Sequence, residues 1–415
     1  MDTVSTAANT PALTLSRATD ADWDDIIAAD ARAFAMRNPL PQDERDDLRG
    51  KINDNDVVVV RDPGLASTPL VGVSMYYRMT MTVPGGSVTP AAGLSWVSVA
   101  ATHRRRGILR RMITELFDQW LGEGQTFAIL TASEGTIYER FGFGPACLAD
   151  EIKVGSSARM RTAPPQTAAV HFATAEEVAA AVPDIHRRWA ATRPGALGRD
   201  DAWWAPILAD RETAHAPAAS GLHYLLHPDG YASYRVIKDV ADGSVRAELS
   251  EIFTVTDEAH TELWRVLISL DLIPSLTGSI PVDDPLRHKL VDLRSAQITS
   301  QGDKMWLRIL DVPAALQQRT YAADVDAVIE VTDDFAGRGG RFSLSVVDGK
   351  ATVTATDAAP TVRLDISVLS SVYLGGFGVR DFAAADRLWT DSTASLDALD
   401  AALRTPYAPF AGTFF

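Results

Sequence analysis

Cysteine is nearly absent from this sequence, which contains one, Cys147, among 415 residues. A single thiol excludes an intrachain disulfide, so the fold does not depend on an oxidising compartment. The eight histidines include no H-E-x-x-H pair or similar metal-ligand spacing, and we expect no metal site. No histidine stands in a recognisable relation to Cys147, which favours a buried structural cysteine over the alternative of a catalytic nucleophile.

Long apolar runs are also missing. No stretch approaches the ~20 apolar residues that cross a bilayer. The N-terminal residues lack the basic flank and apolar core of a conventional export signal. We therefore expect a soluble, cytoplasmic protein, with secretion by an unconventional route left open.

Positive charge is scarce, because 39 Lys and Arg face 54 Asp and Glu for a formal net charge of -15. Such a surface repels polyanions, which argues against general nucleic-acid binding and favours a cationic substrate. The composition is 46% hydrophobic, as in globular proteins, and the length allows two or three domains.

Helical and strand patterns alternate over residues 1–150. Apolar residues at helical spacing predict a helix from Trp23 to Phe34, with Thr19 and nearby aspartates as capping candidates. Residues 57–62, 70–83 and 127–133 are predicted to be strands, and a short helix is predicted within EGTIYERFGFGPA, residues 134–146.

An unusual basic segment, VSVAATHRRRGILRRM, occupies residues 97–112. Its pattern predicts a strand, a turn and a helix whose apolar residues form one stripe from Ile108 to Trp120. Free N–H groups at a helix start, the helix dipole and three arginines favour a pyrophosphate-binding turn, and Gly107 allows close approach of the anion. A solvated basic helix cap and a nucleic-acid patch are the alternatives, and the latter lacks interleaved aromatic residues.

A second strand and helix resemble this segment. After a Pro-rich stretch at 162–168, taken as a domain boundary, a helix is predicted at 174–191 and an α/β pattern continues to about 300. Within it, ELSEIFTVTDEAHTELWRVLISL (248–270) aligns with GLSWVSVAATHRRRGILRRMITEL (93–116). We interpret this as a weak internal repeat whose second copy lacks the basic turn, with chance similarity as the alternative.

The remaining residues, from about 301, predict strands within 341–357 joined by an Asp-Gly turn at 348–349, and helices near 366–373 and 380–404. The aromatic end, TPYAPFAGTFF, differs from a frayed polar tail. We expect it to be packed.

Several of these motifs together resemble a known family. The run around Arg104 and Gly107 is similar to the acetyl-coenzyme A signature R/Q-x-x-G-x-G/A of the GCN5-related N-acetyltransferases (GNAT), with Leu109 at the last position. With ASEGTIYERFGFGPA, LLHPDGYASYRV, MWLRILDVPAALQQRTY and the aromatic end, the chain resembles the Eis (enhanced intracellular survival) family. The resemblance implies an α/β and α+β multidomain fold: a catalytic GNAT domain (1–150), a degenerate GNAT-like domain (151–300) and a sterol-carrier-protein-like domain (301–415) whose C-terminus reaches the active site.

The resemblance also implies site residues. Tyr138 matches the general acid, and the terminal carboxylate of Phe415 matches the base. Strand alternation places Val97 and Val99 on one face, with Trp96 and Ser98 on the other. The implied coenzyme-binding residues are Val97, Val99, Arg104, Arg105, Arg106, Gly107, Ile108, Leu109 and Ser133, and the implied acceptor-binding residues are Phe34, Met36, Trp96 and Phe414.

These positions have structural alternatives. Tyr138 and Trp96 could be packing residues, and the tail could only pack. Met36 and Phe414 stand where family members carry acidic residues, a departure that bears on substrate choice.

The implied activity is acetyl-CoA-dependent acetylation of amines of aminoglycosides or polyamines, at one or several positions, or of lysine ε-amines, by a homohexamer without metal. The alternative is a lipid- or sterol-binding protein with a vestigial acetyltransferase domain. The intact RRRGI segment favours the enzyme.

Overall fold

The computed structural model describes residues 12–161, 168–211, 218–239 and 243–415. The chain forms two compact units. One consists of Met1–Arg78 with Ala92–Gln125, and the other of Met79–Ala91 with Thr126–Phe415.

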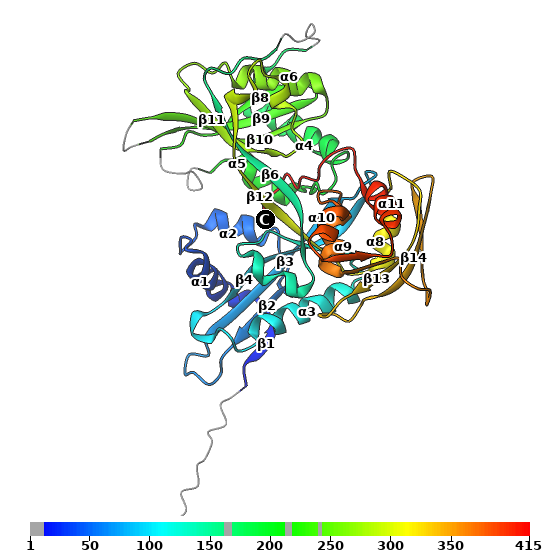
Figure 1. Cartoon of the computed structure of the whole chain (residues 1–415). Helices are drawn as coiled ribbons and strands as arrows, with labels where there is room; N and C mark the ends of the chain where they lie inside the picture. The colour runs from blue at the N-terminus through cyan, green and yellow to red at the C-terminus, as the bar shows by residue number, and fades with distance from the viewer. Residues whose placement is uncertain (1–11, 162–167, 212–217, 240–242) are drawn as a thin grey trace, which may run out of the picture. The chain divides into compact units, whose positions relative to one another are not determined.

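The first unit is a sheet with three helices, drawn in blue to cyan in Figure 1. Its strands follow the order β1-β2-β3-β4, with residues 79–82 of β3 and 88–91 of β4 belonging to the second unit, and β2 pairs antiparallel with both β1 and β3. The elements are β1 (Thr14–Arg17), α1 (Trp23–Phe34), α2 (Gln42–Arg49), β2 (Val57–Arg61), β3 (Leu70–Thr82), β4 (Val88–Val99) and α3 (Ile108–Gly122), with 3-10 turns η1 (Asp20–Asp22), η2 (Asp54–Asp56) and η3 (Ala101–His103).

Helix α3 confirms the predicted apolar stripe. Ile108, Met112 and Leu116 are almost fully buried, together with Ile113, Phe117 and Trp120. The helix lies very close to β3, because a Cβ added to Gly72 would come within 2.8 Å of Ile108 Cγ2. This packing fixes where the helix begins, and therefore where the basic turn lies.

The second unit contains the strands β5-β12-β6-β11-β10-β9-β8-β7, which are neighbours in this order, and among their described residues β10 and β11 form the one parallel pair. Its elements are β5 (Phe127–Leu130), η4 (Gly135–Ile137), η5 (Glu139–Phe141), β6 (Gly144–Gly155), β7 (His171–Phe172), α4 (Ala175–Ala190), α5 (Asp201–Ala209), β8 (His223–His227), β9 (Gly230–Lys238), β10 (Val245–Thr254), α6 (Asp257–Leu267), β11 (Ser275–Pro281), α7 (Leu286–Lys289), η7 (Leu293–Ser295) and β12 (Ala296–Ile309).

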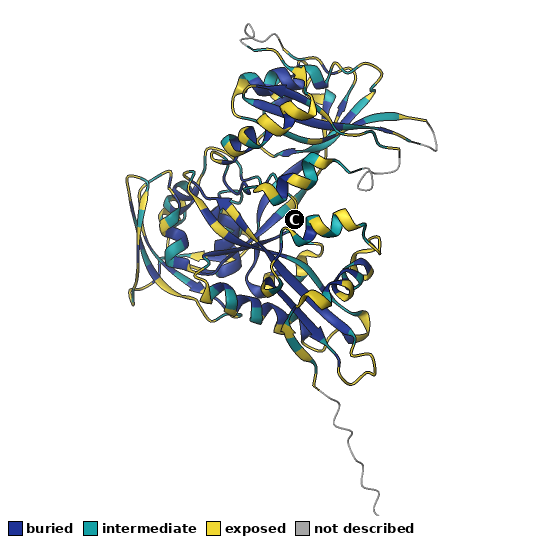
Figure 2. Cartoon of the chain, turned by 180° about the vertical axis from the view of Figure 1, so that it is seen from behind, coloured by how far each residue is buried: buried dark blue, intermediate teal, exposed yellow. Residues whose placement is uncertain are grey.

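Helices cover both faces of the β8–β10 part of this sheet. Leu225 packs with Leu263 and Trp264 of α6, whereas its neighbour Leu226 packs with Trp189 of α4 and Trp204 of α5. Adjacent strand residues point to opposite faces, so α6 covers one face and α4 with α5 covers the other. Figure 2 shows the buried residues concentrated in the strands and on the inner faces of these helices.

A five-stranded sheet in the order β15-β14-β13-β16-β17 follows within the same unit. Asp348 and Gly349 have φ of 51° and 73°, which confirms the predicted tight turn. The elements are α8 (Val312–Gln318), β13 (Val325–Thr332), β14 (Gly340–Val347), β15 (Lys350–Ala355), β16 (Val362–Asp365), α9 (Ile366–Tyr373), α10 (Val379–Ala384), β17 (Leu388–Thr390) and α11 (Thr393–Leu403).

Two predicted helices are wrong in detail. The helix predicted at 380–404 is interrupted, because α10 ends before Asp386, which has φ of 57°, and β17 then pairs with β16 and buries Leu388. The short helix predicted after β5 is the pair of 3-10 turns η4 and η5. In the first segment strand pairing, and in both segments a residue with a left-handed backbone (Asp386 and Gly142), prevents the helix that the local spacing predicts.

Two of the predicted domain boundaries, at residues 150 and 300, lie within strands of the structure. Strand β6 runs through residue 150 and β12 runs through residue 300. Residues 162–167 of the Pro-rich boundary lie outside the described part of the chain.

Candidate active site

The turn between β4 and α3 has a backbone suited to binding an anion. Arg105 and Gly107 both have left-handed conformations, with φ of 63° and 75°. Such alternation directs successive N–H groups to one side, at the start of a 15-residue helix whose dipole is positive there. No heavy atom lies within 4 Å of a Cβ built on Gly107, so the approach to these groups is open.

A buried hydrogen bond between His103 and Asp62, which the sequence analysis missed, holds this turn. His103 Nε2 lies 2.9 Å from Asp62 Oδ2, and both residues are 6% exposed. His103 Nδ1 is 2.8 Å from Thr102 Oγ1, and the N–H of Gly64 donates to Asp62 Oδ1. The hydrogen bond with His103 lowers the pKa of Asp62. The pair fixes η3, from which the three arginines follow.

Gly107 borders an open cavity of about 610 Å³, whose other lining residues are Leu15, Arg110, Arg111, Thr114 and Glu115. Arg104, Arg105 and Arg106 are exposed, and Arg106 Nη1 lies 3.7 Å from Asp62 Oδ2. These residues fit a phosphate-bearing group, because they supply free space, positive charge and backbone donors together.

The residues predicted to bind the coenzyme differ in whether their side chains are accessible to a ligand. The Ile108 side chain is 2% exposed and belongs to the core, which leaves its backbone N–H for a ligand. Leu109, Val97 and Val99 are half-buried. Their side chains remain partly accessible at the start of α3 and the end of β4.

The predicted alternation along β4 is interrupted at Trp96. This residue has φ of 51°, outside the extended region, so the direction of its side chain does not follow from strand periodicity. A hydrogen bond links the Trp96 and Tyr77 side chains, and burial raises the pKa of Tyr77 well above its ordinary value. The alternation argument remains valid only for Val97, Ser98 and Val99, which follow the distortion.

The end of α1 carries the next predicted residues, Phe34 and Met36, which are 41% and 61% exposed. One turn earlier, Asp30 Oδ1 is buried and has no hydrogen-bond partner among the described residues. Burial raises the pKa of Asp30 to about 6. The sequence did contain a signal for Asp30, a carboxylate within the apolar stripe of the predicted helix.

Tyr138 and Ser133 belong to the second unit. Tyr138 lies between η4 and η5, is 8% exposed, and packs edge-to-face against Phe143 at 6.2 Å between ring centroids. Burial and then the charge of Glu134 raise its pKa to about 12. Ser133 is exposed in the bend after β5, five residues before the phenol.

The C-terminal segment is hydrogen-bonded up to Thr413. Leu197 N–H donates to Ala411 O, and Phe410 N–H donates to Pro194 O, at 2.9 and 3.0 Å. Arg199 donates to Gly412 O and to Thr413 Oγ1. The prediction of a packed tail is therefore confirmed to this point, whereas Phe414 is 81% exposed and Phe415 is half-buried.

Within the described ranges, no group of three or more His, Cys, Asp or Glu side chains is arranged to hold a metal ion. Cys147 is fully buried, and burial raises the pKa of its thiol. No helix in the described part of the chain is both long and apolar enough to cross a membrane.

Family comparisons agree with this architecture. Residues 14–146 and 195–309 each match a family described as acetyltransferase (GNAT) domain, and residues 312–412 match the sterol carrier protein domain. The chain is an N-acetyltransferase with two tandem GNAT domains followed by a sterol-carrier-protein-like domain, which confirms the predicted fold class.

Individual relatives identify the family. Over 399 residues the chain is 40% identical to N-acetyltransferase Eis of Mycobacterium tuberculosis, an alignment covering 94% of this chain and 96% of that protein. The crystal structure of Eis1 from Mycobacterium abscessus matches with a TM-score of 0.83 and 30% identity, over 98% of this chain and 100% of that one. The chain belongs to the Eis family of N-acetyltransferases. A GCN5-related N-acetyltransferase from Anabaena variabilis, 21% identical with a TM-score of 0.82 over 97% and 100% of the two chains, shares the fold.

Proposed function

We propose that this enzyme transfers the acetyl group of acetyl-CoA to primary amines of a cationic acceptor. The acceptor is an aminoglycoside or polyamine, acetylated at one or several positions, or a protein lysine. The observation that carries the proposal is the intact turn at Arg105–Gly107, with its open approach and its positive charge. The net charge of -15 supports a cationic acceptor.

In this proposal the turn binds the pyrophosphate of acetyl-CoA through backbone N–H groups, with Arg104, Arg105 and Arg106 supplying charge. Val97, Val99, Leu109 and Ser133 contact the rest of the coenzyme, and Ile108 contributes its backbone. Phe34, Met36, Trp96 and Phe414 line the acceptor site. The coenzyme supplies an activated thioester.

The reaction is direct attack of the amine nitrogen on the thioester carbonyl carbon, followed by cleavage of the C–S bond. The amine loses one proton and the thiolate gains one, so the site needs both a base and an acid. The carboxylate of Phe415 accepts the amine proton. A terminal carboxylate is anionic at neutral pH, with an ordinary pKa near ~3.5.

Tyr138 donates its proton to the departing sulfur. A pKa of about 12 keeps the phenol protonated at neutral pH. Transfer to a thiolate whose conjugate acid has a pKa near ~8.5 in water is uphill. Desolvation of the coenzyme's thiol in the site raises the pKa of that thiol too, and this reduces the difference between the two pKa values.

Release of free thiol tests the proposal. Full-length protein is incubated with acetyl-CoA and neomycin, kanamycin or a lysine-rich peptide, and mass spectrometry counts the acetyl groups on each acceptor. We expect amine-dependent thiol release with at least one acceptor. Retained coenzyme binding without thiol release for any amine would contradict the proposal and would favour the lipid-binding alternative.

The homohexamer implied by the family resemblance is a separate proposal. Light scattering coupled to size-exclusion chromatography measures the mass of the assembly, to be compared with six chains of 44.7 kDa each. A monomer or dimer at micromolar concentration would contradict it.

A further inference from the structure

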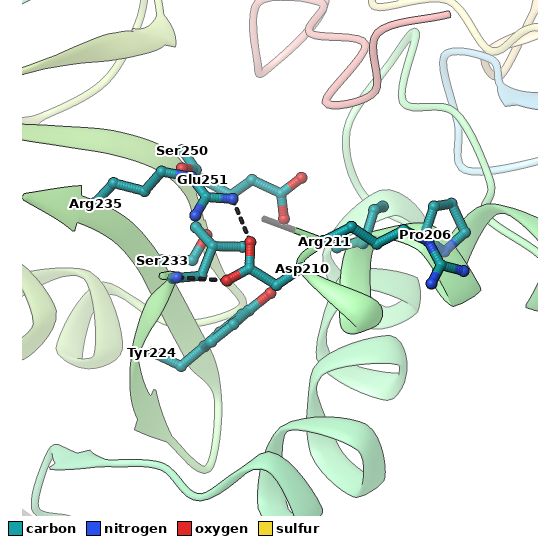
Figure 3. Close-up of a pocket in the computed structure, with 10 residues that line it drawn as sticks. Pro206, Asp210, Arg211, Tyr224, Ser233, Arg235, Ser250 and Glu251 are labelled. Carbon is teal, nitrogen blue, oxygen red and sulfur yellow. Dashed lines mark hydrogen bonds and ion pairs between the residues drawn. The ribbon is translucent and has the colours of Figure 1, made fainter. Parts of the chain in front are cut away.

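The second acetyltransferase domain contains a pocket of its own, shown in Figure 3. It has a volume of about 260 Å³ and lies between α5 and the face of β8, β9 and β10 that α5 covers. Its lining consists of Pro206, Ile207, Asp210, Arg211, Leu222, Tyr224, Ser233, Arg235, Ser250 and Glu251. The volume suits one small ring or a short chain and is too small for a coenzyme.

The pocket lies where the internal repeat places the counterpart of Trp96. In the aligned segments, Ser250 and Glu251 take the positions of Ser95 and Trp96. Both strands are irregular there, since β10 has a bulge between Leu249 and Glu251 and β4 has the left-handed Trp96. This step rests on the acceptor role proposed for Trp96, and it indicates that the second copy keeps an acceptor-side pocket.

The coenzyme side of the second copy has been lost. Helix α6 begins at a Thr256 cap with Asp257 and Glu258 in its first turn, where α3 is preceded by arginines. Two carboxylates at a helix start compete with an anion for the same N–H groups. A pocket retained without a phosphate site indicates a binding module.

Three hydroxyls of the pocket are available to a ligand. Ser233 is 1% exposed, and its hydroxyl forms no hydrogen bond within the described residues. The hydroxyls of Tyr224 and Ser250 likewise have no hydrogen-bond partner in the described ranges. These hydroxyls line the pocket, so a polar ligand that enters it can pair with them.

Two carboxylates at the pocket are fixed in position. Asp210 forms an ion pair with Arg235 and accepts the N–H of Leu222 at 2.7 Å, as the dashed lines in Figure 3 show. Glu251 pairs with Arg199 and accepts the Tyr231 hydroxyl at 2.7 Å. Glu251 Oε1 accepts a hydrogen bond from Arg199 and can accept a second one. Fixed carboxylates of this kind favour a ligand that donates, such as an ammonium group.

The charges around Tyr224 also favour a cationic ligand. Burial is the largest cause of its raised pKa, which reaches about 12, and the charges of Glu251 and Asp210 come next, ahead of the opposing Arg199 and Arg235. The carboxylates therefore outweigh the arginines at the phenol oxygen.

We propose that this pocket binds a small cationic ligand with primary amine and hydroxyl groups, the chemistry of an amino sugar or amino alcohol. Its ammonium group donates to Glu251, Asp210 adds negative charge nearby, and its hydroxyls pair with Ser233 and Tyr224. The second domain is then an amine-binding module that uses the acceptor side of the acetyltransferase fold without its coenzyme.

Binding of glucosamine to the full-length protein, measured by calorimetry or ligand-detected NMR without acetyl-CoA, tests this. Glucose is the neutral comparator. The variant Tyr224→Phe with Ser233→Ala removes two pocket hydroxyls and no ion pair. The matched control, Tyr407→Phe with Ser345→Ala, makes the same changes outside the pocket. A third variant, Trp96→Ala, alters the proposed acceptor site alone.

We expect glucosamine to bind more tightly than glucose, and the pocket variant to weaken it about fivefold or more, as the loss of two hydrogen bonds predicts. The control and Trp96→Ala variants should leave this affinity unchanged, and acetyl transfer by the pocket variant should keep its kcat. Equal affinity for glucose, or no effect of the pocket variant, would overturn the proposal. Loss of binding only in Trp96→Ala would also overturn it and leave the proposed catalytic function intact.

Discussion

Tyr138 is a buried phenol whose ring packs edge-to-face against that of Phe143. Tyr138→Phe keeps that ring contact and removes the proposed proton donor. We expect kcat to fall tenfold or more, with the KM for acetyl-CoA and the unfolding temperature nearly unchanged. Steady-state kinetics and thermal denaturation measure these quantities, with Tyr407→Phe as the control. Undiminished kcat would remove Tyr138 from its proposed role.

Asp30 makes stability depend on pH in the direction opposite to an ion-paired carboxylate. Its pKa is about 6 in the folded chain and 3.8 as the ordinary value, so between these values the folded state binds the proton more tightly. Its contribution to stability therefore falls as pH rises from about 4 to about 6.

Asp30→Asn removes this dependence. In thermal denaturation, the unfolding temperature of the variant minus that of the wild type should increase between pH 5 and pH 7.5. Asp118→Asn makes the same change at an exposed carboxylate on α3 and serves as the control for the substitution itself. An Asp30→Asn difference that is constant with pH would show that the carboxyl is not desolvated.

At the scale of elements, a matched pair of substitutions distinguishes a specific effect of the β4–α3 turn from the general effect of backbone strain. Gly107 and Gly124 have φ of 75° and 71°, and neither has a heavy atom within 4 Å of a built Cβ. They lie at opposite ends of α3, so Gly124→Ala is a matched control for Gly107→Ala. Each substitution should cost about 1 kcal/mol of stability, because left-handed alanine is strained.

Only Gly107→Ala should affect the coenzyme. We expect the KM for acetyl-CoA to rise about tenfold or more in that variant, since the new methyl group occupies the approach to the N–H groups, and to stay unchanged in Gly124→Ala. Equal KM values in the two variants would mean that the turn does not contact the phosphates.

At the scale of the whole molecule, the proposed function assigns the base to the terminal carboxylate of the third domain. Hydrogen bonds anchor the tail through Thr413, whereas Phe414 is exposed. An extension after Phe415 should therefore leave the unfolding temperature unchanged but abolish most acetyl transfer, because it removes the terminal carboxylate. The same extension at the N-terminus is the control. Full activity of the C-terminal fusion would disprove the proposed base.

Local patterns predicted most elements of the fold. The stripe in α3, the helix from Trp23 to Phe34 and the Asp348-Gly349 turn all follow from spacing within a few residues, and the structure confirms them. The helix predicted at 380–404 failed because the partner of β17 is β16, more than twenty residues earlier in the chain. The direction of Trp96 failed because one left-handed residue interrupts the strand period.

By itself the sequence determined the family, the order of the domains and the basic turn before α3, because these depend on residues that are neighbours in the chain. Only the tertiary structure joined Asp62 to His103 behind that turn and buried Asp30 within the first unit. In the same way it surrounded Ser233 and Tyr224 with Asp210 and Glu251. These groups come from separate strands and helices, and which of them lose water or gain a partner depends on how the sheet and helices pack.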